Sequence, residues 1–327
     1  MISNRGASVI AEDVKEAIND IRSSQKSRET EDYLNLVFTE PVGYLFTRFF
    51  IAIGFTPNMV SMLALIIGIV GGVLFYPKDF TLNLIGVLLE VLSIILDATD
   101  GQMARLTKQT SELGRFLDGC ETVAAYSAMY IALGFRMMSE PIPFTDGILF
   151  GPWVWLLVLP CGGIFHASQC RMSDYYRNLH LYFLLGEEGS ELSRSEELKE
   201  RYAKLRENGS LWTRLYLVFY IPYTQDQEKQ TPNLQVLLER IRQNGGEIPE
   251  EARRAFLPRS RRYMPIINML TVNLRAYVLF ALVLLGLHVW FFPFVILILE
   301  GFKIYMVYAY EKLAQELLQY FPQEKQR

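Results

Sequence analysis

The chain has 327 residues, of which 51% are hydrophobic and 20% charged, and its formal net charge is −3. The hydrophobic residues are gathered in long blocks, which indicates an all-α integral membrane protein rather than a soluble protein of two domains. The net charge gives no sign of a nucleic-acid partner. The three cysteines are an odd number without metal-type spacing, as expected for reduced packing residues.

Residues 1–55 are predicted to form cytoplasmic and interfacial helices. Residues 9–21 fit an amphipathic helix of mixed charge, and no signal peptide is visible, because the first 30 residues are charged and lack an apolar segment. Residues 43–54 carry several aromatic and aliphatic side chains around a lone Arg48. This stretch is too short to span a bilayer, so we expect it to lie in the membrane interface.

Residues 56–170 are predicted to contain four membrane spans. Thr56 and Pro57 form a helix-start signal before the first span, at 59–76, whose glycines permit close contact between helices. The other three spans are expected at 82–96, 114–138 and 151–169.

The remaining residues are predicted to form a cytoplasmic helical insert and two more spans. The insert, 171–265, is charged in composition, and its aromatic stretch 211–223 is expected to rest on the membrane surface. In 266–327 a break near 288–293 separates two spans, which brings the predicted total to six. Lysine and arginine gather in the insert and beside the acidic stretch after residue 96. This bias places both termini, that stretch and the insert on the cytoplasmic side of the membrane, which is the inner or cell membrane if the protein is bacterial.

The most informative segment runs from Asp97 to Asp118, where carboxylates directly follow an apolar run. Acidic side chains at a membrane edge are rare and usually functional. Facing carboxylates on two helix ends can hold one or two hard divalent cations, and Arg105 offers a fork for a phosphate oxygen. The plainer alternative is that the carboxylates pair with nearby basic residues at a wet helix end. Seven residues share the facing sides of the two helices, at i, i+3 and i+4 spacings: Asp97, Asp100, Gly101, Ala104, Arg105, Gly114 and Asp118.

This spacing resembles the signature of the CDP-alcohol phosphotransferases, also called CDP-alcohol phosphatidyltransferases: D-x2-D-G-x2-A-R-x(7–12)-G-x3-D-x3-D. Seven of its eight fixed positions match, with eight residues between Arg105 and Gly114. The resemblance implies transfer of a substituted phosphate from a CDP-linked donor to an alcohol with release of CMP, in phospholipid biosynthesis. It also implies a Mg²⁺ or Mn²⁺ cofactor and lipid partners, and it leaves a homodimer open.

The resemblance also assigns roles to individual positions. It implies that Asp97, Asp100 and Asp118 bind metal and that Asp118 is part of the catalytic site. It implies a cytidine-diphosphate site formed by Asp100, Gly101, Ala104, Arg105, Gly114 and Asp118.

The eighth position departs from the signature, because Thr122 stands where the family has an aspartate that deprotonates the acceptor close to the metal. A threonine hydroxyl cannot act as a base near neutral pH. Glu121 is the first candidate to replace it, as base and as metal ligand, since it lies on the same side of the helix, about 100° away. Glu90 is the second, two turns deeper than Asp97 on the same face. A third possibility is a protein that has lost activity, and a fourth is an acceptor that needs no base.

Several functional alternatives stay open at this stage. Either CDP-diacylglycerol donates to a small polar alcohol, or a CDP-linked head group donates to a lipid alcohol. The alternative to an enzyme is a nucleotide- or lipid-binding membrane protein. A transporter is disfavoured, because its carboxylates would be expected near the bilayer midplane and often in repeated halves. Of the other polar residues, His166 is expected to be a packing or hydrogen-bonded residue rather than a catalytic one, and Glu300 is either functional or paired with Lys303.

Overall fold

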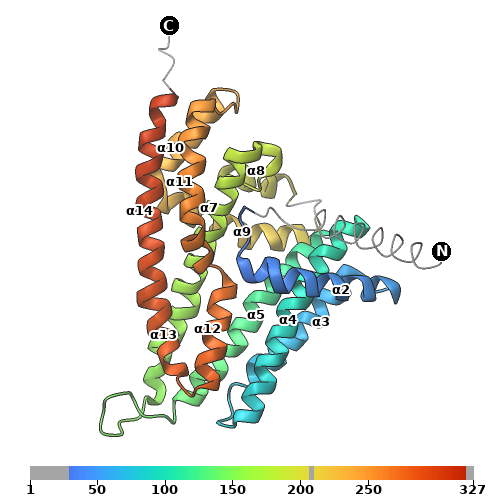
Figure 1. The fold of residues 1–327 in the computed structure, drawn as a ribbon, viewed down its shortest axis with the longest axis vertical. Helices are drawn as coiled ribbons and strands as arrows, with labels where there is room; N and C mark the ends of the chain where they lie inside the picture. Colours follow the sequence, from blue (N-terminus) through green and yellow to red (C-terminus); the bar gives the residue numbers. More distant parts are fainter. Residues whose placement is uncertain (1–28, 206–209, 322–327) are drawn as a thin grey trace, which may run out of the picture. The chain divides into compact units, whose positions relative to one another are not determined.

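The structure is a computed structural model that describes residues 29–205 and 210–321. Within these ranges the chain consists of helices and short connections, with one isolated bridge between Pro141 and Leu149 and no strand. The predicted all-α fold is therefore confirmed (Figure 1). The amphipathic helix predicted at 9–21 lies outside the described residues.

The chain forms two compact units. The first is formed by the described residues up to Leu74 and by Leu84–Met129, and the second by Phe75–Asn83 and the residues from Tyr130 on. The first unit contains two whole helices, α2 (Glu40–Ala52) and α3 (Pro57–Val73). It also contains most of α4 (Phe80–Thr107) and of α5 (Glu112–Met137).

Helix α2 buries one side in the first unit and exposes apolar residues on the other. The buried residues are Glu40, Gly43, Tyr44, Thr47 and Phe50, whereas Leu45 is 68% and Phe49 57% exposed. An exposed apolar stripe on a helix too short to span a bilayer is typical of an interfacial helix. This pattern supports the interfacial helix expected at 43–54, although α2 begins slightly earlier, at Glu40.

Glycines of α3 allow its backbone to approach its neighbours closely. A Cβ atom at Gly71 would lie 3.0 Å from the carbonyl oxygen of Gly86 and 3.2 Å from the amide nitrogen of Glu90, both on α4. A Cβ atom at Gly72 would lie 2.8 Å from the amide nitrogen of Met129 on α5. A larger residue would collide with backbone at both positions, so glycine is what permits this packing, as the sequence predicted.

The second unit is built on three long helical segments. The first, Gly151–Leu185, includes α6 (Trp155–Pro160) and α7 (Ala167–Leu185). The second, Glu250–Leu284, includes α11 (Glu250–Met269) and α12 (Val272–Leu284). The third, His288–Tyr320, includes α13 (Phe291–Pro293) and α14 (Glu300–Leu317). Three shorter helices lie between α7 and α11 in the chain: α8 (Ser195–Leu205), α9 (Leu211–Gln230) and α10 (Pro232–Gln243).

Four of the described helical segments are long and apolar enough to cross a membrane, namely α4 and the three long segments of the second unit. Helix α3 is a shorter apolar helix, and α5, at the place of the predicted third span, is not among the four. Helix α12 ends at Leu284, and Gly286 has a φ of 70°, so the chain breaks just before the predicted position. Helices thus occupy all six predicted positions, while the count of six spans stays a prediction.

The predicted insert has no sharp boundary with the spans. Helix α7 continues through residue 171 to Leu185, and α11 begins at Glu250, well before residue 266. The insert is therefore helical and continuous with two of the long segments, and its assignment as a separate cytoplasmic region stays a prediction.

Polar contacts in the second unit explain several residues that the sequence left open. The hydroxyl of Tyr130 and Nδ1 of His166 are 2.9 Å apart, which confirms a hydrogen-bonded histidine. Lys303 Nζ lies 2.6 Å from Glu300 Oε1, so the structure contains the pair that the sequence left as one of two alternatives for Glu300. The three cysteines are free thiols, as predicted.

Ion pairs around Glu140 join three connections of the second unit. Its carboxylate accepts a hydrogen bond from Arg136 Nε (3.3 Å) and lies 2.8 Å from His288 Nε2 and 3.5 Å from Lys78 Nζ. Arg136 also donates to Asn83 Oδ1 (2.7 Å). Burial by itself would raise the pKa of Glu140. The hydrogen bond from His288 and the neighbouring basic charges outweigh burial and hold this pKa below its ordinary value.

Candidate metal and nucleotide site

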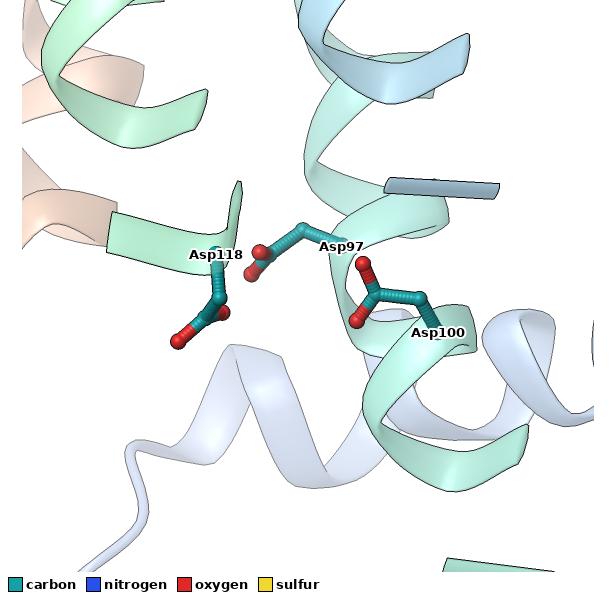
Figure 2. A group of neighbouring side chains, drawn as sticks. All are labelled: Asp97, Asp100 and Asp118. Carbon is teal, nitrogen blue, oxygen red and sulfur yellow. The ribbon is translucent and has the colours of Figure 1, made fainter. Parts of the chain in front are cut away.

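The three predicted metal ligands lie together in the first unit (Figure 2). Asp97 and Asp100 are on α4 and Asp118 is on α5, and one carboxylate oxygen of each lies within 4.8 Å of the other two. Asp100 is buried, Asp97 half-buried and Asp118 exposed, so the group runs from the interior of the unit to its surface. Helix α4 continues to Thr107. The sequence had suggested that the first two carboxylates lie at a helix end. In the structure both lie inside α4.

This arrangement suits a divalent cation. Oxygen ligands bind Mg²⁺ at about 2.1 Å, so ligands on opposite sides of one ion are about 4 Å apart. Like charges at that separation repel by about 1 kcal/mol in water and about 4 kcal/mol at the effective dielectric of a protein surface. A bound cation would remove this repulsion, and carboxylates are the ligands that Mg²⁺ and Mn²⁺ prefer. The residues present therefore fit the cofactor that the sequence predicts.

Ser61 on α3 holds the buried carboxylate of this group. Its hydroxyl contacts Asp100 Oδ2 and lies 3.2 Å from the carbonyl oxygen of Pro57. Ser61 is itself buried, so water does not compete for the contact. Hydrogen bonds to a ligating carboxylate fix its orientation. Sequence reasoning missed Ser61, because its contact with Asp100 spans 39 positions of the chain.

Glu121 is a fourth acidic residue close to the group. It is 3% exposed, its Oε1 lies 3.4 Å from the hydroxyl of Ser93, and its Oε2 is buried without a hydrogen-bond partner in the described ranges. The carboxylate interacts electrostatically with all three members of the group, Asp97, Asp100 and Asp118. Its side chain is therefore turned into the unit and toward the group, and not toward lipid.

Glu90 is equally buried but differs in its surroundings. It is 2% exposed, and its Oε1 lacks a hydrogen-bond partner among the residues described. Its Cγ lies 3.1 Å from the place of a Cβ atom on Gly71. Burial dominates the environment of Glu90, whereas Glu121 is also influenced by the aspartates. Of the two candidate bases, Glu121 is thus the one whose carboxylate interacts electrostatically with the three aspartates.

Arg105 lies over Gly101 on the outer part of the site. A Cβ atom at Gly101 would lie 3.4 Å from Nη1 of Arg105, and Ala104 is half-buried beside it. The Nε atom of Arg105 is buried and has no acceptor within the described part of the chain. An arginine with an unused donor near small residues suits a phosphate oxygen.

Gly114 lies where the turn after α4 enters α5. The hydroxyl of Ser111 accepts a hydrogen bond from Gly114 N (2.9 Å) and donates to Asn58 Oδ1 (3.1 Å). Ser111 is thereby an N-terminal cap of α5, of the kind that satisfies a free backbone N–H. A Cβ atom at Gly114 would lie only 2.9 Å from Asn58 Oδ1, so the signature glycine leaves room for this contact between α3 and α5.

The variable positions of the signature contact α2. Gln102 Nε2 donates to the carbonyl oxygen of Glu40 (3.0 Å) and to the side chain of Glu40. The hydroxyl of Thr47 contacts the Gln102 side chain (3.3 Å), and that of Thr99 contacts the carbonyl oxygen of Gly43 (3.3 Å). All of these contacts are buried. One side of α4 thus holds α2, while the other side carries the acidic group.

Comparison with known proteins bears on this site directly. Residues 55–161 match a family model described as CDP-alcohol phosphatidyltransferase. The matched stretch is about a third of the chain, and it contains every residue of the site described above except those of α2. No curated protein and no solved structure gave a significant match to the chain.

Proposed function

We propose that the chain is a transferase of phospholipid synthesis, because residues 55–161 match the model of the CDP-alcohol phosphatidyltransferase family. On that premise we propose that it transfers a substituted phosphate from a CDP-linked donor to an alcohol and releases CMP. The single observation that supports this most is the group of Asp97, Asp100 and Asp118, with oxygens within 4.8 Å of one another inside the matched domain.

We assign the metal to these three carboxylates, with Mg²⁺ or Mn²⁺ as the cofactor. When bound, such an ion neutralises the pyrophosphate of the donor and stabilises the negative charge that develops as CMP leaves. The exposure of Asp118 supports entry of the donor from that side, because the other two carboxylates are less accessible.

The donor is proposed to lie against Gly101, Ala104, Arg105 and Gly114. The small residues leave space beside the backbone of α4 and at the start of α5. The unused Nε donor of Arg105 would bind a phosphate oxygen of the donor. Arg105 thereby orients the pyrophosphate against the aspartates, which are close enough to interact with its charge.

We propose Glu121 as the base in place of the expected aspartate at Thr122. Its buried carboxylate and its coupling to the three aspartates support this role. Glu121 Oε2, the oxygen without a hydrogen-bond partner among the residues described, would accept the proton of the acceptor hydroxyl as that oxygen attacks the phosphate. The same oxygen is available to the metal.

The protein is proposed to act at the cytoplasmic face of the cell membrane, the inner membrane in a bacterium, with both termini on that side. The distribution of lysine and arginine along the sequence supports this orientation.

The donor can be identified by giving the purified chain two sets of radiolabelled donors in lipid vesicles. Transfer from CDP-diacylglycerol to water-soluble alcohols would show that the CDP-linked donor carries the lipid. Transfer from CDP-choline or CDP-ethanolamine to diacylglycerol would show that the lipid is the acceptor alcohol. Release of CMP from neither set would contradict the proposal and favour a nucleotide- or lipid-binding membrane protein.

A further inference from the structure

Helix α9 exposes an apolar stripe in the second unit. Residues of this stripe recur at i, i+1, i+4, i+7, i+8 and i+11: Leu211, Trp212, Leu215, Val218, Phe219 and Pro222. Phe219 is 68% and Leu211 56% exposed. The opposite side of the helix is buried in the unit and combines one apolar residue, Leu217, with the polar residues Thr213, Thr224 and Gln227. The stripe thus faces away from the rest of the unit, the reverse of a helix on a soluble protein.

Contacts with α7 fix the position of α9 along the axis of α7. Helix α9 lies across the direction of α7 (Figure 1) and contacts it at one place, between Ser168 and Asp174. Three hydrogen bonds hold it there: Tyr223 Oη to Asp174 Oδ2 (3.0 Å), Gln227 Nε2 to the Arg171 carbonyl oxygen (2.8 Å), and Gln230 Nε2 to Ser168 Oγ (3.2 Å).

A polar cluster joins the three long segments of the second unit at this level. On α7, Gln169 follows an apolar run that begins near Trp153. Gln169 contacts Arg275 of α12 (2.7 Å) and Glu300 at the start of α14 (3.0 Å). Arg275 and Glu300 each adjoin the apolar part of a segment that is long and apolar enough to cross a membrane. A charged cluster shared by the three segments thus lies at the height where α9 is attached, and charged side chains are costly at the centre of a bilayer, which favours a position near its edge.

We propose that α9 lies in the lipid–water interface of the membrane, with this stripe inserted among the lipid chains near the head groups. A helix that lies along the membrane plane needs an apolar outer side, aromatic residues and a position at the ends of the spans. The residues of α9 and its contacts meet all three conditions. The insert between α7 and α11 is then attached to the bilayer as well as to the spans. This inference goes beyond the proposed reaction and does not depend on it.

The test places an environment-sensitive fluorophore on the stripe. The variant Phe219→Cys, labelled with a nitrobenzoxadiazole maleimide, is placed in lipid nanodiscs as the full chain. The fluorescence of the unsubstituted chain after the same labelling is subtracted, because the three cysteines of the protein are free thiols that can also react. The matched control is Lys199→Cys, on the exposed polar side of α8, and Val218→Cys is a second position on the stripe.

The label at residues 218 and 219 is expected to be quenched by nitroxide on the lipid chains at least about threefold more than the label at 199. Quenching by iodide in the water is expected to show the opposite order. If iodide reaches the label at 219 as easily as the label at 199, the stripe faces water and the proposal is wrong. If the label at 218 and 219 is shielded from both quenchers, a protein covers the stripe, either a second copy or another partner, and the proposal is equally wrong.

Discussion

Ser61 on α3 donates a hydrogen bond to Asp100 on α4, so the buried carboxylate of the acidic group is held by a helix that carries none of the signature residues. Both residues are buried. The rotamer of Asp100 is therefore set by the packing of α3 against α4. The orientation of a carboxylate in turn decides whether it can share a cation with its neighbours.

Replacing Ser61 should weaken metal binding without unfolding the chain. The variant Ser61→Ala removes the donor to Asp100, and loss of such a supporting contact typically lowers metal affinity about 10- to 100-fold. Binding of Mn²⁺, measured by electron paramagnetic resonance on the purified protein, checks this expectation. Met62→Ala, at an exposed position of the same helix, is the control. Equal Mn²⁺ affinity in Ser61→Ala and the unchanged chain would show that the contact does not position a ligand.

Replacing Glu121 should impair the transfer step more than donor binding. Loss of a general base typically costs about 10²- to 10⁴-fold in rate, so Glu121→Gln should lower kcat by that order. The KM for the donor should change little, because donor contacts are assigned to other residues. Steady-state kinetics of CMP release measure both quantities.

Two further variants separate Glu121 from the other candidates for the base. Thr122→Asp, added to Glu121→Gln, restores the aspartate of the signature and should recover part of the lost rate. Glu90→Gln should have a smaller effect than Glu121→Gln, because Glu90 lacks the coupling to the aspartates. Full activity in Glu121→Gln would end the assignment of the base.

Two glycines of α5 make a matched pair for testing the start of that helix. A Cβ atom in Gly114→Ala would lie 2.9 Å from Asn58 Oδ1 and 3.1 Å from Ser111 Oγ, so it should disturb the cap and cost about 2 kcal/mol, more than alanine gains in a helix. A Cβ atom in Gly119→Ala meets nothing within 4 Å, and alanine favours a helix by about 1 kcal/mol. Thermal unfolding should therefore occur at a lower temperature in Gly114→Ala only. The donor KM should also rise in Gly114→Ala, and similar behaviour of the two variants would contradict the role of the cap.

The ion pairs of Glu140 predict a pH-dependent contribution to stability. Since its pKa is below the ordinary value of 4.5 in the folded protein, its contribution is complete above about pH 4.5 and is lost as the pH falls through the lowered pKa. The unfolding temperature of Glu140→Gln should thus be lower than that of the unchanged chain at neutral pH, and the difference should shrink in acid. Asp146→Asn, on an exposed position of the same connection, is the control. A difference that is independent of pH would rule out this origin.

The acidic group could be predicted from the sequence because its parts are local. Asp97, Asp100 and Arg105 follow one another at helical spacing, and Asp118 is on the next helix, so no distant contact had to be known. The helical fold and the break near Gly286 were predictable for the same reason, from apolar runs and turn residues.

Contacts between distant residues could not be predicted in this way. Ser61 and Asp100 are 39 positions apart, and Gln102 and Glu40 are 62 apart. Serine and glutamine occur too often for either to stand out without knowing which helices pack together. The extent of α4 was also underestimated, because polar side chains after residue 96 looked like the end of a helix. In the structure they continue it to Thr107, with one side turned to α2 and the other to the acidic group.

Release of CMP by the purified chain tests the central claim most directly, namely that the acidic group supports transfer from a CDP-linked donor. With a labelled donor and an alcohol acceptor, the unchanged chain should form CMP in Mg²⁺ or Mn²⁺ and none after chelation by EDTA. Asp118→Asn should lower the rate by about 10²-fold or more, since a metal site contributes several kcal/mol to such a step. CMP formation by Asp118→Asn at the unchanged rate, or formation that persists in EDTA, would contradict the account.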